Sequence, residues 1–239
     1  TRSGSVTGVQ TCALPICKTS KLKVSKSCSS RLVASKSYYI AFSNYILYSF
    51  QNFVMSYEFA EGYKIRDQSA THFLTFSIMG WIDIFSRSRY RDIVLESFEF
   101  CRVNKGLNIG AYVIMSNHIH VIWTATNNNL SDIVRDFKTF TSKAIFGSIE
   151  TEPESRRDWL LYMFRFYANR TNANENFKVW TGNNHPEEIH SESFLRTKLN
   201  YIHDNPVRAK LVADPSHYLY SSAANYETGK GIMAIDFLF

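Results

Sequence analysis

The stretch of residues 111–123 limits the possible folds of this chain most strongly. It is rich in β-branched and aromatic residues, which favour strands, and its pattern is broken only at Ser116 and Asn117. Two strands joined by a tight turn fit this pattern, so the stretch predicts a β-hairpin. The chain must therefore build a sheet around this hairpin.

The second strand of the hairpin contains the sequence His118-Ile119-His120. Side chains alternate between the two faces of a strand, so both histidines share one face while Ile119 and Val121 point into a core. Two imidazoles on one rigid strand form half of a metal site. The alternative, two histidines on a solvated sheet face, is about equally compatible with this spacing alone.

The remaining periodicity predicts an α+β fold with a central antiparallel sheet. Apolar spacing predicts a first strand at residues 72–79 and helices at 89–104, 130–146 and 191–204. We expect Gly106 and Gly147 to end the first two helices and Pro206 to end the third. The order β-α-β-β-α needs one more strand to complete a split β-α-β layer, and we predict that strand at residues 177–180. We predict an aromatic helix at residues 156–170, for which core packing is the simpler interpretation and base stacking the alternative.

Charge and cysteine content divide the chain near residue 54. Residues 1–54 contain seven of the 27 Lys and Arg residues and none of the 21 Asp and Glu residues. Subtracting the seven leaves 20 basic and 21 acidic residues, so any basic surface on the remainder must be local. Three of the four cysteines also precede residue 54, and Cys101 alone lies beyond it. No internal disulfide is then expected, which fits a reducing, cytoplasmic setting.

Residues 1–54 are expected to form no packed part of the domain, which we predict spans residues 55–239. Residues 6–16 resemble the conceptual translation of a common sequencing-library adapter, which places a true start at Met55. The alternative is a targeting segment. Its apolar stretch at residues 38–54 is interrupted by polar residues, so it cannot be a spanning helix, and no membrane partner is expected.

The last predicted helix carries Tyr201 and Asn205. They are four residues apart, so they lie on the same helix face one turn from each other. Asn205 can offer an amide oxygen to a hard divalent cation, and the phenol of Tyr201 is a latent nucleophile for a polarised phosphodiester. The spacing alone fits equally a Tyr on a core edge and an Asn that ends a helix before a proline.

Several motifs together carry a resemblance to a known family. Met115-Ser-Asn-His-Ile-His-Val-Ile122 resembles the His-hydrophobe-His strand of HUH endonucleases. Tyr201-Ile-His-Asp-Asn-Pro-Val-Arg-Ala-Lys-Leu211 resembles the Tyr-Ile-His-x-Asn-Pro-Val-Arg-Ala-Gly-Leu signature of the REP-associated tyrosine transposases. Tyr218-Leu-Tyr-Ser-Ser222 is similar to the Tyr-x-Tyr/Trp-Ser-Ser element that follows it. The resemblance also includes the helix around residues 134–142 and spans residues 64–226 in the right order.

The resemblance implies a single-tyrosine DNA transposase on a ferredoxin-like sheet. It implies Mg²⁺ or Mn²⁺ held by His118, His120 and Asn205, with Tyr201 as the nucleophile. The implied substrate is single-stranded DNA with palindromic hairpin repeats. Cleavage would leave a 5′-phosphotyrosine link and a free 3′-OH that later rejoins strands. Lys210 departs from the signature, because the family usually has Gly at that position.

Four cationic residues are the predicted DNA contacts. Arg135, Lys138 and Lys143 lie on the helix after the His strand, and Arg208 lies just past the Tyr helix. Because the body as a whole is not basic, phosphate contacts must be local, although a solvated helix face is an equal alternative for each residue.

Two other functions stay open from the sequence. One is a domesticated relative that binds structured single-stranded DNA without cutting it, and the retained Tyr201 and both histidines argue against it. The other is a metal-dependent hydrolase unrelated to DNA, which needs a carboxylate base such as Glu187 or Glu188. The sequence is compatible with either a monomer or a homodimer.

Overall fold

The computed structural model describes residues 64–171 and 176–239, and all structural statements below concern these residues. These residues all belong to one compact unit. The predictions for residues 1–54 therefore lie outside the described residues.

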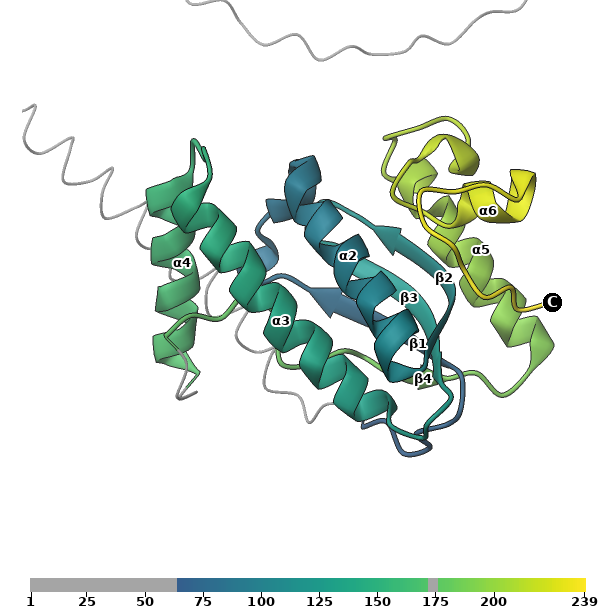
Figure 1. Ribbon diagram of the computed structural model, residues 1–239. Coiled ribbons are helices and arrows are strands. Elements are labelled where there is room, and N and C mark those ends of the chain that lie inside the picture. Colours follow the sequence, from purple (N-terminus) through teal and green to yellow (C-terminus); the bar gives the residue numbers. More distant parts are fainter. Residues whose placement is uncertain (1–63, 172–175) are drawn as a thin grey trace, which may run out of the picture. The chain divides into compact units, whose positions relative to one another are not determined.

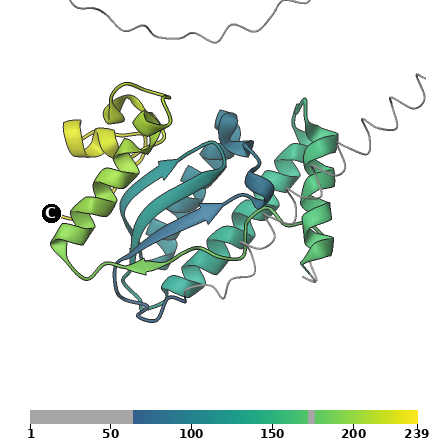
Figure 2. The same cartoon turned by 180° about the vertical axis from the view of Figure 1, so that it is seen from behind.

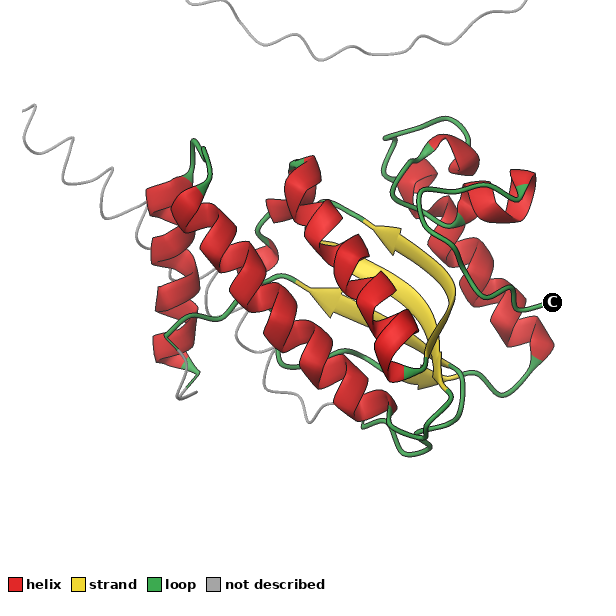
Figure 3. Cartoon of the chain, in the orientation of Figure 1, coloured by secondary structure: helices red, strands yellow, loops and turns green. Residues whose placement is uncertain are grey.

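A four-stranded antiparallel sheet organises the unit (Figure 3). Its strand order is β2-β3-β1-β4, so the His strand β3 is central, as predicted. The predicted hairpin is confirmed, because β2 pairs with β3 along its length. The strands are β1 (His72–Ser77), β2 (Leu107–Ile114), β3 (His118–Ala125) and β4 (Glu187–Glu188).

The helices lie on both faces of this sheet, which confirms the predicted α+β class. Helices α2 and α3 cover one face, and α4 lies beside α3 at the end away from α5 (Figure 1). Helix α5 lies against the opposite face, and the view from behind shows the sheet in front of α2 and α3 (Figure 2). The helices are α2 (Ser88–Lys105), α3 (Leu130–Thr151), α4 (Arg157–Arg170), α5 (Glu192–Arg208) and α6 (Ala223–Thr228). No helix among these residues is long and apolar enough to cross a membrane.

The alternation of β3 divides the apolar residues between two cores. Ile119 and Val121 belong to a core of 34 buried residues between the sheet and α2, α3 and α4. Ile122 belongs to a core of only seven buried residues, which includes Leu199 and Ile202 of α5. The predicted core positions on β3 are confirmed, and the smaller core is the one that holds α5.

The predicted ends of α3 and α5 are wrong, whereas Gly106 ends α2 as expected in a left-handed conformation with φ 71°. Gly147 lies inside α3, which continues to Thr151. A glycine inside a helix costs only about 1 kcal/mol, and the buried Ile149 continues the apolar stripe beyond it. Helix α5 runs through Pro206 to Arg208, because the proline removes a single backbone donor in the last turn.

The predicted strand at residues 177–180 is also wrong. Trp180 makes only an isolated bridge with Ile78, and the fourth strand is the two-residue β4. The chain does follow the open edge of β1 between these points, since the Thr75 amide donates to the Asn184 carbonyl at 2.8 Å. His185 has φ 41° and is followed by Pro186, which has no amide hydrogen, so a regular ladder cannot form there.

The aromatic helix α4 mainly packs. Phe164 is fully buried and Tyr167 is 7% exposed, so both belong to the large core. Trp159 and Tyr162 point outward and are exposed. Core packing, the simpler of the two interpretations, accounts for the buried side of the helix.

Candidate active site

His118 and His120 lie side by side on β3 and face α5. Their ring centroids are 4.8 Å apart, as the shared strand face predicts. His120 is almost fully buried, and its ring stacks on Phe73 of the neighbouring strand at 5.4 Å. Packing on a central strand therefore fixes both rings before any ligand arrives.

A polar side chain engages one nitrogen of each imidazole. Nδ1 of His118 lies 2.7 Å from Oδ1 of Asn117, and Nδ1 of His120 lies 2.8 Å from Oγ1 of Thr75. The Asn117 amide nitrogen donates to the Trp81 carbonyl at 3.2 Å, which orients its oxygen toward His118. A carboxamide oxygen only accepts, so Nδ1 of His118 donates and Nε2 keeps its lone pair. Such outer hydrogen bonds fix the tautomer and orientation of metal-binding histidines.

The surroundings keep both imidazoles neutral. Burial lowers the pKa of His118 to about 4. Burial, followed by the nearby charges of His118 and Lys198, lowers the pKa of His120 to about 3. Neutral imidazole is the form that binds metals, so this donor pair fits a divalent cation. No cluster of three His, Cys, Asp or Glu side chains occurs in the part of the chain that the structure describes. A further protein ligand would therefore come from a residue such as Asn205.

Helix α5 brings Tyr201 to the histidines. The helix begins after Ser191, whose hydroxyl accepts a hydrogen bond from the Phe194 amide. The Tyr201 ring lies edge-on to His120 at 5.1 Å and to Phe73 at 5.9 Å. Its side chain is 37% exposed, so a substrate can reach it. The predicted nucleophile and metal pair thus come together within one chain.

The end of α5 shows why the family signature has Gly at the position of Lys210. The Leu211 amide donates to the Pro206 carbonyl and the Lys210 amide to the Val207 carbonyl, each at 2.9 Å. This pattern is a Schellman turn, and Lys210 occupies its left-handed position with φ 59°. Glycine adopts this conformation without strain, so the lysine carries a strained backbone next to the site.

A polar contact between His203 and Ser222 connects α5 to the sheet. Nε2 of His203 lies 2.9 Å from Oγ of Ser222, and that oxygen also accepts from the Tyr112 amide of β2 at 3.0 Å. Burial lowers the pKa of His203 to about 4. The sequence analysis missed this contact, although His203 and Ser222 belong to two of the quoted motifs.

The predicted DNA contacts divide between the two faces of the sheet. The Arg208 guanidinium lies 5.3 Å from the Tyr201 ring, so the structure brings it to the site. Arg135, Lys138 and Lys143 lie on α3, which covers the face opposite α5. Arg135 forms ion pairs with two aspartates on its own helix, at positions 132 and 136.

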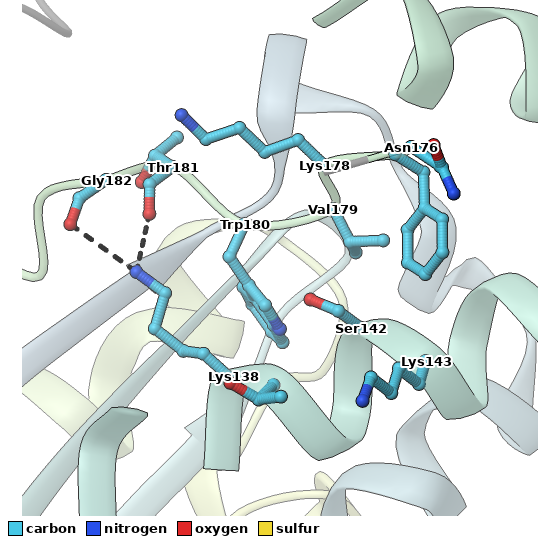
Figure 4. Close-up of a pocket in the computed structure, with 11 residues that line it drawn as sticks. Lys138, Ser142, Lys143, Asn176, Lys178, Val179, Trp180, Thr181 and Gly182 are labelled. Atoms are coloured by element: carbon cyan, nitrogen blue, oxygen red, sulfur yellow. Dashed lines mark hydrogen bonds between the residues drawn. The ribbon is translucent and has the colours of Figure 1, made fainter. Parts of the chain in front are cut away.

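Lys138 and Lys143 line a cavity of about 350 Å³ between α3 and residues 176–182 (Figure 4). The Lys138 ammonium donates to the Thr181 carbonyl at 2.6 Å and to the Asn184 side chain at 2.9 Å. Lys178 is a further basic residue of the lining. These lysines form a basic surface that is separate from the histidine face.

Two further side chains near the histidines escaped the sequence analysis. Lys198 lies one turn before Tyr201 on α5, and the i, i+3 spacing was the available signal. Trp81 lies 6.1 Å from His118 between ring centroids and is 56% exposed. Trp81 follows β1 in an irregular turn, so periodicity gave no signal for it.

The two carboxylates named for a hydrolase both have side-chain partners. Glu187 pairs with Lys198 at 2.7 Å, and Glu188 lies 3.3 Å from His190. Glu187 is therefore tied to Lys198 at the edge of the site, and Glu188 is directed to His190.

Two comparisons with known proteins found a similarity. A family model described as "Transposase IS200 like" matches residues 83–181, which include both histidines but not Tyr201. One similar solved structure is a REP-associated tyrosine transposase bound to a REP hairpin, with 16% identity and a TM-score of 0.51. The similarity covers 75% of this chain and 92% of that one. No curated protein matches the chain. The predicted resemblance is thereby confirmed: residues 83–181 match the family model of the IS200-like transposases, and the fold is similar to that of a REP-associated tyrosine transposase.

Proposed function

We propose that this protein cleaves and rejoins single-stranded DNA at hairpin-forming repeats, with Tyr201 as the nucleophile. The observation that carries the proposal is the packing of the Tyr201 ring against His120 at 5.1 Å. The hairpin substrate is taken from the similar solved structure, which is bound to a REP hairpin.

The reaction exchanges one phosphoester for another. The Tyr201 oxygen attacks the phosphorus, the phenolic proton leaves to water, and the P–O3′ bond breaks. The departing 3′ oxygen takes up a proton, and the 5′ phosphate stays linked to the tyrosine. Because the bond energy is kept in the phosphotyrosine, the 3′-OH can reverse the step without ATP.

The histidines would serve as ligands in this reaction. His118, His120 and Asn205 would hold Mg²⁺ or Mn²⁺, which when bound supplies charge stabilisation at the phosphate oxygens. Asn117 and Thr75 keep each imidazole oriented for this role. Both histidines stay neutral at neutral pH, so they neither repel the cation nor act as acids.

Six other tyrosines of the described residues are poorer candidates for the nucleophile. Tyr112 is fully buried, and Tyr167 is 7% exposed. Tyr162 is exposed, but it lies on α4, away from the sheet face that carries the histidines. Three more tyrosines, Tyr218, Tyr220 and Tyr226, hold their hydroxyls in hydrogen bonds to Ile114, Asp92 and Gly110.

The α3 lysines would hold DNA outside the cleavage site. Lys138 and Lys143 lie on the sheet face opposite the histidines, where they cannot contact the scissile phosphate. We assign them, with Arg135, to phosphates of flanking DNA, and Arg208 to phosphates beside Tyr201. Each lost phosphate contact should lower the salt dependence of binding.

The test is adduct formation on hairpin DNA. Labelled single-stranded DNA with a hairpin is incubated with Mg²⁺ or Mn²⁺, and covalent protein–DNA adduct is detected after denaturation. We expect adduct with wild type and with the control Tyr162→Phe, and none with Tyr201→Phe. Adduct that persists in Tyr201→Phe would overturn the assignment. DNA binding by wild type without adduct would favour the non-cleaving binding protein.

A further inference from the structure

Lys198 is an ammonium placed among the rings of the active site. Its Nζ lies 4.4 Å from the Phe73 ring centroid, and that ring contacts both His120 and Tyr201. The Lys198 side chain is only 17% exposed. Helix periodicity places it on the same face as Tyr201, three residues earlier.

Lys198 contacts the rings of Phe73 and Phe194 and forms one ion pair. Its ion pair is with Glu187, whose side chain is 46% exposed, and such pairs stabilise a fold by only about 0–1 kcal/mol. The Lys198 ammonium lies next to the neutral histidines, so its positive charge opposes the binding of a metal cation there. An anionic ligand that approaches both charges removes this conflict, and a DNA phosphate is such a ligand.

We propose that Lys198 leaves Glu187 and binds a phosphate of the DNA strand that is cleaved at Tyr201. This inference rests on the proposed function, since it concerns the same site. With Arg208, the Tyr face of α5 then carries one cation on each side of the nucleophile. The two residues are about 15 Å apart along the helix axis, so they would contact different phosphates of the strand.

Substitution of Glu187 distinguishes phosphate binding by Lys198 from a purely structural role of the ion pair. If the ion pair only braces α5 against β4, loss of either partner has the same effect. If Lys198 binds phosphate, removal of Glu187 frees the lysine and strengthens DNA binding. The matched control is Arg196, which is on the same helix, 54% exposed and paired with Glu192.

The experiment measures affinity for a hairpin DNA with single-stranded flanks against salt concentration, in a Tyr201→Phe background that cannot cleave. Lys198→Gln should weaken binding and reduce the salt slope by about 0.7, the value for one phosphate on a single strand. Glu187→Gln should keep the slope and bind at least as tightly as the background. Arg196→Gln should match the background, and Lys198→Arg should restore the slope.

Two results would overturn the proposal. If Lys198→Gln and Glu187→Gln weakened DNA binding equally and left the salt slope unchanged, Lys198 would have only a structural role in its ion pair. Equal behaviour of Lys198→Gln and Arg196→Gln would exclude a phosphate contact. Wild type that binds this DNA without forming adduct would refute cleavage instead, while the slope comparison would still decide the role of Lys198.

A second observation, separate from those on Lys198, concerns Trp81 and the binding of a DNA base. Its indole is 56% exposed beside His118, and its backbone has φ 55°, an uncommon conformation for a large residue. Strain of this kind clusters at functional sites, and exposed rings are the usual stacking partners of unpaired bases. We infer that Trp81 stacks on an unpaired base beside the cleaved phosphate.

Substitution of the ring tests this inference. Trp81→Leu should weaken binding of the same DNA by about 5- to 150-fold, which corresponds to one stacked base, while Trp81→Phe should retain most of the affinity. The control Trp159→Leu, an exposed tryptophan on α4, should leave affinity unchanged. Equal affinities for Trp81→Leu and Trp159→Leu would refute the inference.

Discussion

Replacement of Lys210 by glycine should stabilise the protein, because the turn after α5 forces a side chain into a left-handed conformation. An L-residue there costs about 1–2 kcal/mol relative to glycine, and Lys210 has φ 59°. Glycine also gains about 0.4–1 kcal/mol of freedom in the unfolded chain, which opposes the effect. The net expectation is a gain of about 0.5–1 kcal/mol.

The matched comparison is Lys210→Gly with Lys210→Ala. Both variants lose the charge near the helix C-terminus, but only alanine keeps the strained Cβ. Urea unfolding should give the glycine variant the higher midpoint, with equal slopes for the two. Ala209→Gly, at the preceding right-handed position, should instead destabilise by up to about 1 kcal/mol. A glycine variant at position 210 that is no more stable than the alanine variant would refute the reasoning.

Three further predictions concern the polar contacts of the site. Asn117→Ala should weaken Mn²⁺ binding by about 10- to 100-fold, measured by calorimetry, because His118 loses its orienting partner. The metal-free protein should lose stability as pH falls from 6.5 toward 4, by up to about 1.4 kcal/mol per pH unit for each of His118, His120 and His203. Their folded pKa values are depressed, so only the unfolded chain takes up protons there, and urea unfolding at several pH values measures the loss. His203→Ala should destabilise by about 1–3 kcal/mol and slow adduct formation, whereas His203→Gln, which can still donate to Ser222, should recover part of both.

The sequence predicted the sheet better than the ends of its helices. Alternation along β3 correctly assigned His118 and His120 to one face and Ile119 and Val121 to the other. Side chains of a strand alternate with a period of two, so the burial of one face fixes which residues lie on each face. Gly147 was misread as a helix end, since a single glycine breaks a helix only where no apolar stripe continues beyond it.

The approach of Tyr201 to His120 could not be derived from spacing, because it depends on how α5 packs across the sheet. Only the motif resemblance suggested that the two would meet. Lys198 was accessible in principle, since it shares the helix face of Tyr201, but nothing in the sequence showed its partner Glu187 nearby. Trp81 has no periodic neighbours, so only the folded chain could show its position.

The two halves of the site are held by different forces. The histidines lie on a strand whose other face belongs to the 34-residue core, so their positions are fixed by general packing. The nucleophile lies on a helix that shares only seven buried residues with the sheet. Because this apolar contact is small, the His203–Ser222 hydrogen bond is an important further link between α5 and the sheet. Loss of this bond should therefore alter adduct formation more than it alters metal binding.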